Sequence, residues 1–378
     1  MSGFACGEDA EDGVFQFRMN NITADGQLDF TRQRRVPLGT KSIDRYLIAN
    51  GDVLFNATNS PELVGKSAYF PGFSEPAVFS NHFLRLRPIP DRLNGQYLAR
   101  WLHLQFQIGR FKSMCRQWVN QATVNRESLL AMCLPLPPIE EQKRIAAILD
   151  AADALRVKRR ESIVLLDALL QSIFLDMFGD PVTNPMGWEK VKLGESGEVI
   201  TGNTPSRSNP KYYGDFIEWI KSDNINTPSC FLTKAQEGLS ELGKKVARVA
   251  PAGSILITCI AGSPACIGNA AIVDRVVAFN QQINAFMPGS DVELWYMFML
   301  LVVGKSLIQS SSTKSMKGMV SKSALSSVSI PLPPLSLQRR FSSIVEAAER
   351  QKARLRAHLD ELDALFSSLQ SRAFNGEL

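Results

Sequence analysis

The residues of this sequence that could do chemistry are few, and they do not complete a catalytic motif. Gly65-Lys66-Ser67 matches the end of a phosphate-binding loop, but that loop also needs a glycine where this chain has Ser60. No C-x-x-C pair occurs and there are only 3 histidines, so a zinc site or a disulfide framework is disfavoured. We expect buried thiols at the six cysteine positions, which are Cys6, Cys115, Cys133, Cys230, Cys259 and Cys266.

A second partial motif, Asn209-Pro210-Lys211-Tyr212, is similar to the N-P-P-Y loop of adenine methyltransferases. Lys211 replaces the second proline, and no Gly-rich cofactor loop follows a predicted strand elsewhere. Clusters of acidic residues typical of nucleases and Ser/His/Asp arrangements are not evident. The sequence therefore predicts no catalytic residue, no metal and no cofactor bound by this chain.

Cationic and amide side chains in predicted loops point instead to DNA. Arginine pairs well with guanine, asparagine and glutamine pair with adenine, and lysine neutralises phosphate. A net charge of +5 is compatible with an anionic partner. In the first half of the chain the candidate DNA contacts are Arg32, Arg34, Arg35, Asn56, Asn59, Lys66, Arg116, Gln117, Asn120, Gln121 and Arg126. In the second half they are Lys221, Asn224, Asn280, Gln281, Gln282, Lys314, Lys317 and Lys322.

These candidates have different expected roles. Gln281 and Gln282 fall in a polar break between predicted strands, where we expect them to read bases. Lys314 and Lys317 fall in a Ser-rich loop and are expected to contact phosphate. The basic run Lys158-Arg159-Arg160 is interpreted as a solvated face or a partner contact. For every candidate the simpler alternative is a solvated side chain or a local turn hydrogen bond.

The element that must position these residues is a long helix within Leu134–Pro181. It follows a Pro-Leu-Pro-Pro sequence, ends at a Gly and Pro stop signal, and carries apolar residues at helical spacing. If Glu140–Phe178 is helical throughout, it is about 58 Å long at 1.5 Å per residue. This length is typical of a coiled coil.

The same stretch occurs a second time, 196 residues later. Pro135–Pro138 matches Pro331–Pro334, and Leu166-Asp167-Ala168-Leu169 matches Leu362-Asp363-Ala364-Leu365 in the same register. We therefore predict a duplicated unit, in which a globular domain is followed by a long helix. A helical hairpin inside one core is the alternative, disfavoured because about 150 residues separate the helices.

The predicted fold is α+β, with two mixed α/β globular domains separated by two long antiparallel coiled-coil helices in a pseudo-two-fold arrangement. The expected segments are residues 1–133 (domain), 134–181 (helix), 182–330 (domain) and 331–378 (helix). The apolar residues expected to pair the helices, with Leu166 and Leu362 buried at or near the pair, are Ile148, Ala152, Leu166, Leu169, Ile173, Ile344, Ala348, Leu362, Leu365 and Leu369.

The second globular region opens with Trp188–Gly194 (W-x-x-V-x-L-G) and Thr201–Pro205, for which the first region has no counterpart. Met1 falls roughly where Thr201 would, so either the first domain lacks an opening strand or the chain is truncated at its N-terminus. No apolar segment is long enough to span a bilayer, and the N-terminus does not read as a signal peptide. We expect a cytoplasmic protein without a membrane partner.

The repeated P-L-P-P-plus-helix units and the W-x-x-V-x-L-G opening resemble the specificity subunits of type I restriction–modification systems, over essentially the whole chain. The resemblance implies that each globular domain is a target-recognition domain for half of a bipartite double-stranded DNA site. It also implies that the helices dock two modification subunits, which carry adenine-methyltransferase activity and S-adenosylmethionine. Restriction subunits join them in the full complex. The alternative is a coiled-coil scaffold that tethers proteins and binds nucleic acid only non-specifically.

Overall fold

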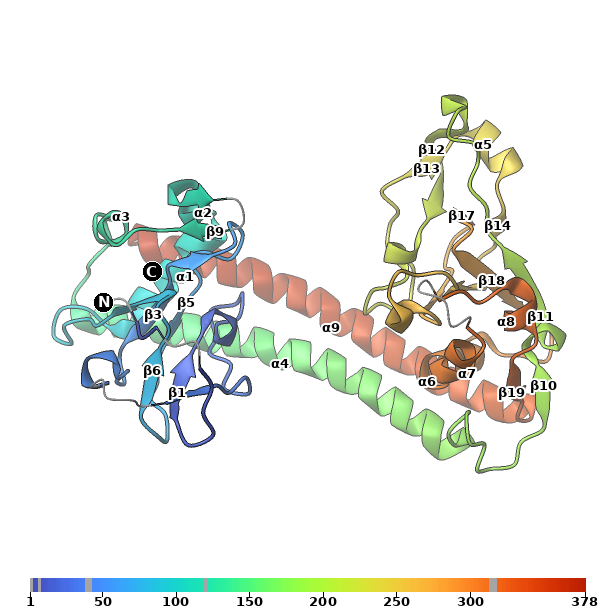
Figure 1. The fold of residues 1–378 in the computed structure, drawn as a ribbon, viewed down its shortest axis with the longest axis horizontal. Coiled ribbons are helices and arrows are strands. Elements are labelled where there is room, and N and C mark those ends of the chain that lie inside the picture. The colour runs from blue at the N-terminus through green and yellow to red at the C-terminus, as the bar shows by residue number, and fades with distance from the viewer. Residues whose placement is uncertain (1–2, 6–7, 38–42, 119–120, 313–317) are drawn as a thin grey trace. The chain divides into compact units, whose positions relative to one another are not determined.

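The computed structural model describes residues 3–5, 8–37, 43–118, 121–312 and 318–378, and the fold is α+β. The chain forms two compact units. The first unit contains Met1–Arg160 and Ala357–Leu378, and the second contains Glu161–Arg356. Both long helices, α4 (Ile139–Phe178) and α9 (Leu335–Asn375), contribute to both units (Figure 1).

The first unit is built on short sheets with three small helices. Its sheets have the orders β2-β1-β6, β5-β3-β7 and β4-β9-β8. The strands are β1 (Val14–Phe17), β2 (Arg35–Val36), β3 (Val53–Asn56), β4 (Thr58–Asn59), β5 (Ser67–Tyr69), β6 (Ala77–Phe79), β7 (Phe83–Leu86), β8 (Arg116–Trp118) and β9 (Gln121–Thr123). The helices are α1 (Gly95–Gln107), α2 (Arg110–Met114) and α3 (Arg126–Leu130).

The second unit contains sheets with the orders β11-β18-β15-β16, β13-β12-β17-β14 and β10-β19. The strands are β10 (Lys190–Lys192), β11 (Gly197–Thr201), β12 (Tyr213–Ile220), β13 (Gly238–Leu239), β14 (Val249–Ala250), β15 (Ile255–Thr258), β16 (Ala270–Ile272), β17 (Val277–Phe279), β18 (Ile283–Pro288) and β19 (Ser329–Pro331). Its helices are α5 (Glu241–Val246), α6 (Leu294–Val303), α7 (Lys305–Ser310) and α8 (Lys322–Ser326).

The two units share one strand plan. β3 lies between β5 and β7, and β15 lies between β16 and β18, all in antiparallel pairs. The parallel pair of β1 with β6 has its counterpart in β12 with β17. Among the described residues the units differ at one edge, because β18 carries the additional strand β11 while β7 pairs only with β3.

Each unit holds its long helix through a buried glutamine and a buried tyrosine. Gln142 accepts a hydrogen bond from the Asn94 amide (2.9 Å) and donates to the carbonyls of Arg92 and Pro137. Gln338 accepts from the Glu293 amide (2.9 Å) and donates to the carbonyls of Asp291 and Pro333. These side chains satisfy backbone groups that the helix N-terminus and the preceding prolines leave without partners.

The tyrosines repeat the same geometry. Tyr97 on α1 donates its hydroxyl to the Pro135 carbonyl (2.9 Å), and Tyr296 on α6 donates to Pro331 (2.7 Å). Both side chains are fully buried. Pro135 and Pro331 thus lie just before a long helix, and the carbonyl of each accepts a hydrogen bond from a helix of the domain.

The apolar faces of the helices pack into the domain cores as well as near each other. In the first unit Ile145, Leu149 and Phe366 belong to the cluster around α1, together with Ala146, Ala152, Ala373 and Phe374. In the second unit Phe174, Phe178, Phe341 and Val345 join the cluster around α6. Among the residues predicted to pair the helices, Ala152 is buried and Ile148, Leu166, Ile173, Ile344, Ala348, Leu362 and Leu369 are partly buried.

Two of the predicted pairing residues face outward. Leu169 is 52% exposed and Leu365 is 50% exposed, so their placement between the helices is wrong. The buried face instead continues one position later, through Leu170 and Phe366. Leu166 and Leu362, predicted to be buried at or near the helix pair, are partly buried, and the inward-facing stripe follows the domain cores.

Buried charges join the two helices inside each unit. In the first unit Arg156 bonds Asp153 (2.8 Å) and Asp363 (2.5 Å). In the second unit Lys352 bonds Asp167 (2.5 Å) and Glu349. At the 196-residue repeat, Arg156 corresponds to Lys352, Asp153 to Glu349 and Asp363 to Asp167. Each of these residues on α4 therefore has its counterpart on α9, and the reverse. In both units these ion pairs therefore join α4 to α9.

Candidate nucleic-acid interface

In the first unit, the structure brings four candidate DNA contacts onto one small sheet. Asn59 on β4 pairs with Ala122 on β9, and Arg116 on β8 pairs with Thr123, which also lies on β9. Gln121 at the start of β9 and Arg116 are exposed. Gln117 follows Arg116 on β8. Their placement on neighbouring strands suits contact with consecutive groups of one DNA backbone or groove.

The arginines near β2 are engaged with acidic residues. Arg35 makes a bidentate pair with Glu75 (2.6 and 2.7 Å), and these hydrogen bonds lower the pKa of Glu75. Arg34 pairs with Asp9, and Arg32 lies 3.4 Å from Asp29. Arg32 keeps a largely exposed side chain, whereas Arg34 and Arg35 would have to give up carboxylate partners to bind phosphate.

Two candidates of the first unit are structural, and their prediction as DNA contacts is wrong for this structure. Lys66 is 6% exposed and donates to the carbonyls of Met19 and Ile22, while burial lowers its pKa. Asn56 is fully buried at the end of β3. Because Lys66 points into the domain, Gly65-Lys66-Ser67 cannot cradle phosphate, in agreement with its interpretation as a chance match.

In the second unit, β12 and β13 form an extension that also carries α5 (Figure 1). Glu237 accepts hydrogen bonds from Arg207 and Lys221, which lower its pKa to about 2. The Arg207 guanidinium lies over the rings of Tyr213 (4.4 Å) and Trp219 (5.1 Å). This network fixes two cations over the partly buried ring of Tyr213 and the buried ring of Trp219, an arrangement suited to phosphate contacts.

Sequence reasoning found Lys221 in this network but missed the others. Arg207, Tyr213 and Trp219 lie on segments whose contact depends on the β12–β13 pairing, which joins residues about 20 positions apart. The extension also exposes Lys211, Lys244 and Arg248. The cations that lie in the sequence around Trp219–Lys221 were the signal from which this network could have been predicted.

The turn between β17 and β18 presents the two predicted base readers. Gln281 is exposed, and its amide oxygen accepts a hydrogen bond from Thr204. Gln282 is partly buried and accepts from Asn280 (3.2 Å). Each glutamine thus accepts one internal hydrogen bond, which bidentate pairing with a base would have to replace, and Gln281 is the more exposed of the two.

Asn280 and Asn224 are local structural residues, so their prediction as DNA contacts is wrong for this structure. Asn280 is 7% exposed and its side chain bonds both the amide and the side chain of Gln282. Asn224 is 8% exposed and bonds Lys221, Thr233 and Lys234 around its own turn. Both make the local turn bonds that were the alternative interpretation.

The remaining candidates divide into two groups. Lys322 and Arg126 are exposed at the equivalent small helices α8 and α3. Asn120, Lys314 and Lys317 lie outside the described residues, and so do the side-chain surroundings of Gln117. Arg160, from the basic run on α4, contacts Asp363 (3.4 Å) and Asp25 (3.7 Å).

The described part of the chain gives no sign of a catalytic centre. It contains no group of three or more His, Cys, Asp or Glu side chains placed to hold a metal ion. Asn209, in the methyltransferase-like motif, caps a short 3-10 helix by accepting from the Lys211 amide. Among the described residues, no helix is long and apolar enough to cross a membrane.

Comparison with known proteins relates both units to one family. The family model for the type I restriction modification DNA specificity domain matches residues 7–165 and again residues 185–362. A chain assigned as the specificity subunit of the type I restriction enzyme MjaX of Methanocaldococcus jannaschii is 26% identical over 346 residues, covering 86% of this chain and 78% of the relative. The HindI specificity subunit of Haemophilus influenzae is 32% identical over 139 residues, 36% of this chain and 28% of the relative.

Solved structures show the same fold. A chain from a study of complex assembly and conformational transition of the type I R-M system superposes with a TM-score of 0.59 at 22% identity, covering 97% of this chain and 92% of that chain. The type I restriction–modification S subunit from M. genitalium gives a TM-score of 0.55 at 13% identity, covering 96% and 92% of the respective chains.

Proposed function

Because this chain belongs to the family of type I restriction–modification specificity subunits, a non-catalytic family that recognises DNA, we propose that its two units each read one half of a bipartite site. In this proposal α4 and α9 carry two adenine-methyltransferase modification subunits. Those subunits bind S-adenosylmethionine, and restriction subunits join the full complex. A cytoplasmic location remains an expectation.

The observation that carries the partner proposal is an exposed leucine repeated in both units. Leu169 and Leu365 occupy equivalent positions of the L-D-A-L repeat, and each is about half exposed. An apolar side chain kept exposed at two equivalent places is expected where one kind of partner docks twice. On α4, Leu169 lies near the exposed Val164 and Leu165, which enlarge the apolar surface of the second unit.

The DNA proposal is supported by the unequal surfaces of the units. The first offers Arg116 and Gln121 on a three-stranded sheet, whereas the second offers Gln281 and the Arg207–Lys221 network. Two different sets of base-pairing and phosphate-binding groups on a common strand plan fit two different half-sites.

Partner assembly tests the proposal. Leu169→Glu and Leu365→Glu each place a charge on one proposed docking surface, so each variant should retain one modification subunit, and the double variant none. Native mass spectrometry of complexes formed with the cognate modification subunit measures this directly. Gln351→Glu, an exposed change on α9, is the control. Two bound subunits with unchanged affinity in the double variant would rule out this docking surface.

A further inference from the structure

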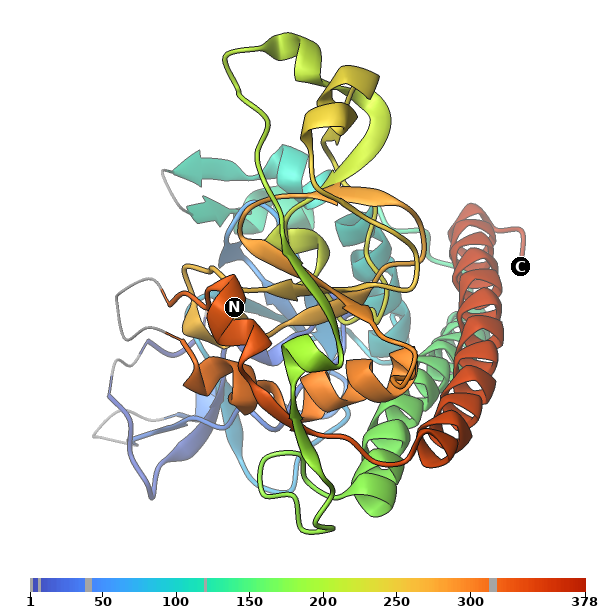
Figure 2. The ribbon, with the colours of Figure 1, turned by 90° about the vertical axis from the view of Figure 1, so that its right-hand side faces the viewer.

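The second unit contains a cavity of about 370 Å³ where its domain meets the two long helices. The wall includes residues of α4, α6 and α9 and of the loop at residues 225–230. Figure 2 shows α6 (orange) beside α4 (green) and α9 (red). All lining residues belong to the second unit, and the volume lies in the range of sites that bind small molecules.

The first unit holds an arginine at the equivalent place. Arg100 on α1 and Met299 on α6 each follow the buried tyrosine of their helix by three residues. The Arg100 guanidinium donates to Asp153 (2.8 Å), whose equivalent at the 196-residue repeat is Glu349. Met299 and Glu349 both line the cavity. The cavity therefore lies where the first unit places a guanidinium group.

Two further replacements account for the space. Phe366, over whose ring the Arg100 guanidinium lies at 5.8 Å, has Leu170 as its equivalent. His103, three residues after Arg100, has Val302 as its equivalent. Leu170 and Val302 line the cavity. At this place the second unit thus carries smaller, apolar side chains where the first unit carries larger and polar ones.

The acceptor of that guanidinium is retained in the second unit. In the first unit the two carboxylate oxygens of Asp153 bond two different arginines. In the second unit Oε1 of Glu349 accepts from Lys352, whereas the ion-pair partner of Oε2 is Arg356, at 3.9 Å. That distance exceeds a hydrogen bond, and among the described residues no donor bonds Oε2. The Glu349 side chain is only 14% exposed, so a second donor would stabilise it.

The two lysines of the cavity wall are bound elsewhere. Lys352 donates to Asp167 and to Oε1 of Glu349. Lys305 donates to a backbone carbonyl and to the side chain of Asn269. Because the equivalent carboxylate of the first unit binds two guanidinium groups, a second cation is compatible with the first at this position.

Much of the remaining wall is apolar and aromatic. Trp295 and Phe298 of α6 line the cavity, with their rings edge to face at 6.1 Å. Trp295 also packs edge to face against Phe231 (5.7 Å), which fixes the orientation of the indole. Aromatic rings beside a carboxylate favour a cationic group attached to an apolar chain, since the rings attract the charge and cover the chain.

We propose that this cavity is a binding site for a small molecule that carries a guanidinium group on an apolar chain. The guanidinium donates to Oε2 of Glu349, in the place that Arg100 takes in the first unit, and the chain packs against Trp295 and Met299. Because the wall combines α6 with α4 and α9, the bound molecule fastens the domain of the second unit to its long helices. Arg100 does the same for the first unit by joining α1 to α4.

Titration of the full-length chain with n-butylguanidinium tests the site without DNA or a partner subunit. Isothermal titration calorimetry should show one saturable site with a dissociation constant of about 1 mM or tighter. Butylurea has the same shape without the charge and should bind at least about tenfold more weakly. Glu349→Gln, which keeps the size of the acceptor, should weaken n-butylguanidinium binding by a similar factor.

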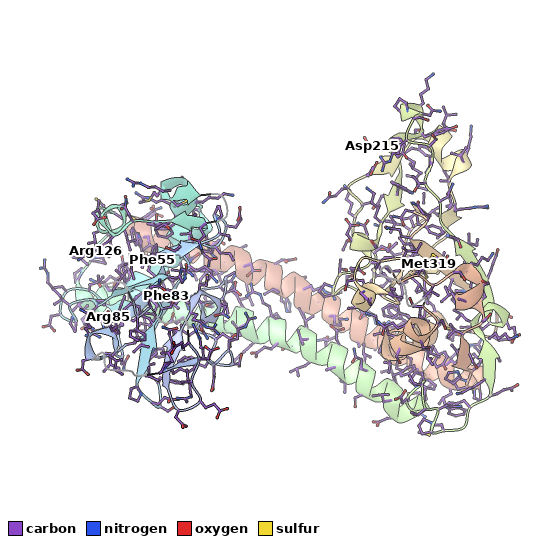
Figure 3. All side chains as sticks on the ribbon, in the orientation of Figure 1. Phe55, Phe83, Arg85, Arg126, Asp215 and Met319 are labelled. Atoms are coloured by element: carbon purple, nitrogen blue, oxygen red, sulfur yellow. The ribbon has the colours of Figure 1, made fainter. Side chains whose placement is uncertain are left out.

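Met299→Arg should abolish binding, because its own side chain then supplies the guanidinium. The matched control is Met319→Arg at a 42% exposed position outside the cavity (Met319 is labelled in Figure 3), which should leave the affinity unchanged. Hydrogen exchange should show protection of residues 225–230 and 295–302 by the ligand. Equal affinity for butylurea, unchanged affinity in Met299→Arg or Glu349→Gln, or no saturable binding up to about 10 mM would overturn the proposal.

Discussion

The two units fasten their long helices in the same way but differ at their other surfaces. Gln142 with Tyr97 and Gln338 with Tyr296 make the same hydrogen bonds to equivalent backbone groups. The candidate DNA contacts match less closely, because Arg116 and Gln121 in the first unit lie on other elements than Lys221 and Gln281 in the second. The contacts that fix a helix to a domain must be kept in both copies, whereas surfaces that bind different sequences must differ.

The buried charge groups show a subtler difference. In the first unit Asp153 also receives a hydrogen bond from Arg100 on α1 (2.8 Å) and from Gln27 (2.9 Å). In the second unit the position of Arg100 is taken by Met299, and Glu349 depends on cations of its own helix. The first unit therefore has a cation from its domain for the buried carboxylate, whereas among the described residues of the second unit Glu349 pairs only with cations of α9.

The largest predicted difference follows from these charges. Lys352→Met should destabilise the second unit by about 2–4 kcal/mol, because it leaves the largely buried Glu349 and the half-exposed Asp167 without their shared cation. Arg156→Met should cost the first unit less, about 1–2 kcal/mol, because Arg100 still pairs with Asp153. Hydrogen exchange of each unit under native conditions measures both costs. Equal costs would show that Arg100 does not compensate.

Replacing Gln142 or Gln338 should destabilise only the unit that contains it. Gln142→Leu removes three hydrogen bonds from the first unit and leaves backbone groups unpaired, at a cost of about 2–3 kcal/mol. Gln338→Leu should have the same effect on the second unit only. Denaturant unfolding followed by unit-specific exchange separates the two, with the exposed Gln351→Leu as control. If either variant lowered the stability of both units equally, the contacts of Gln142 and Gln338 would not be independent.

Mild acid should affect the first unit more than the second. Burial lowers the pKa of His103 to about 4, and its equivalent in the second unit is Val302. As pH falls below 6.5 the unfolded state takes up a proton that folded His103 does not, so stability is lost progressively down to about pH 4. The loss should be about 3 kcal/mol, and His103→Leu should flatten the pH dependence of unfolding. An unchanged slope in this variant would contradict the assignment.

The repeat and the helices were predictable from sequence because they rest on local patterns. The P-L-P-P sequence and the 3.6-residue apolar spacing are local patterns, and their recurrence at a constant offset of 196 residues can be read directly from the sequence. The orientation of Leu169 and Leu365 was not predictable, because it depends on which helix face the domain cores cover. The burial of Lys66 and Asn56 likewise follows from strand packing that brings residues such as Met19 and Lys66 together. Polar type and loop position alone cannot separate a turn asparagine such as Asn224 from a base-reading one.

Mapping of methylated sites tests the central claim, that the units read separate half-sites. The chain and its modification partner would be expressed as the unmodified protein, as Gln121→Ala, and as Gln281→Ala, and the methylated sites would be sequenced. Each variant should lose about 1–3 kcal/mol of discrimination at one base pair, with Gln121→Ala relaxing one half and Gln281→Ala the other, and the spacing unchanged. Relaxed bases in both halves from a single variant, or an altered spacing, would contradict the account.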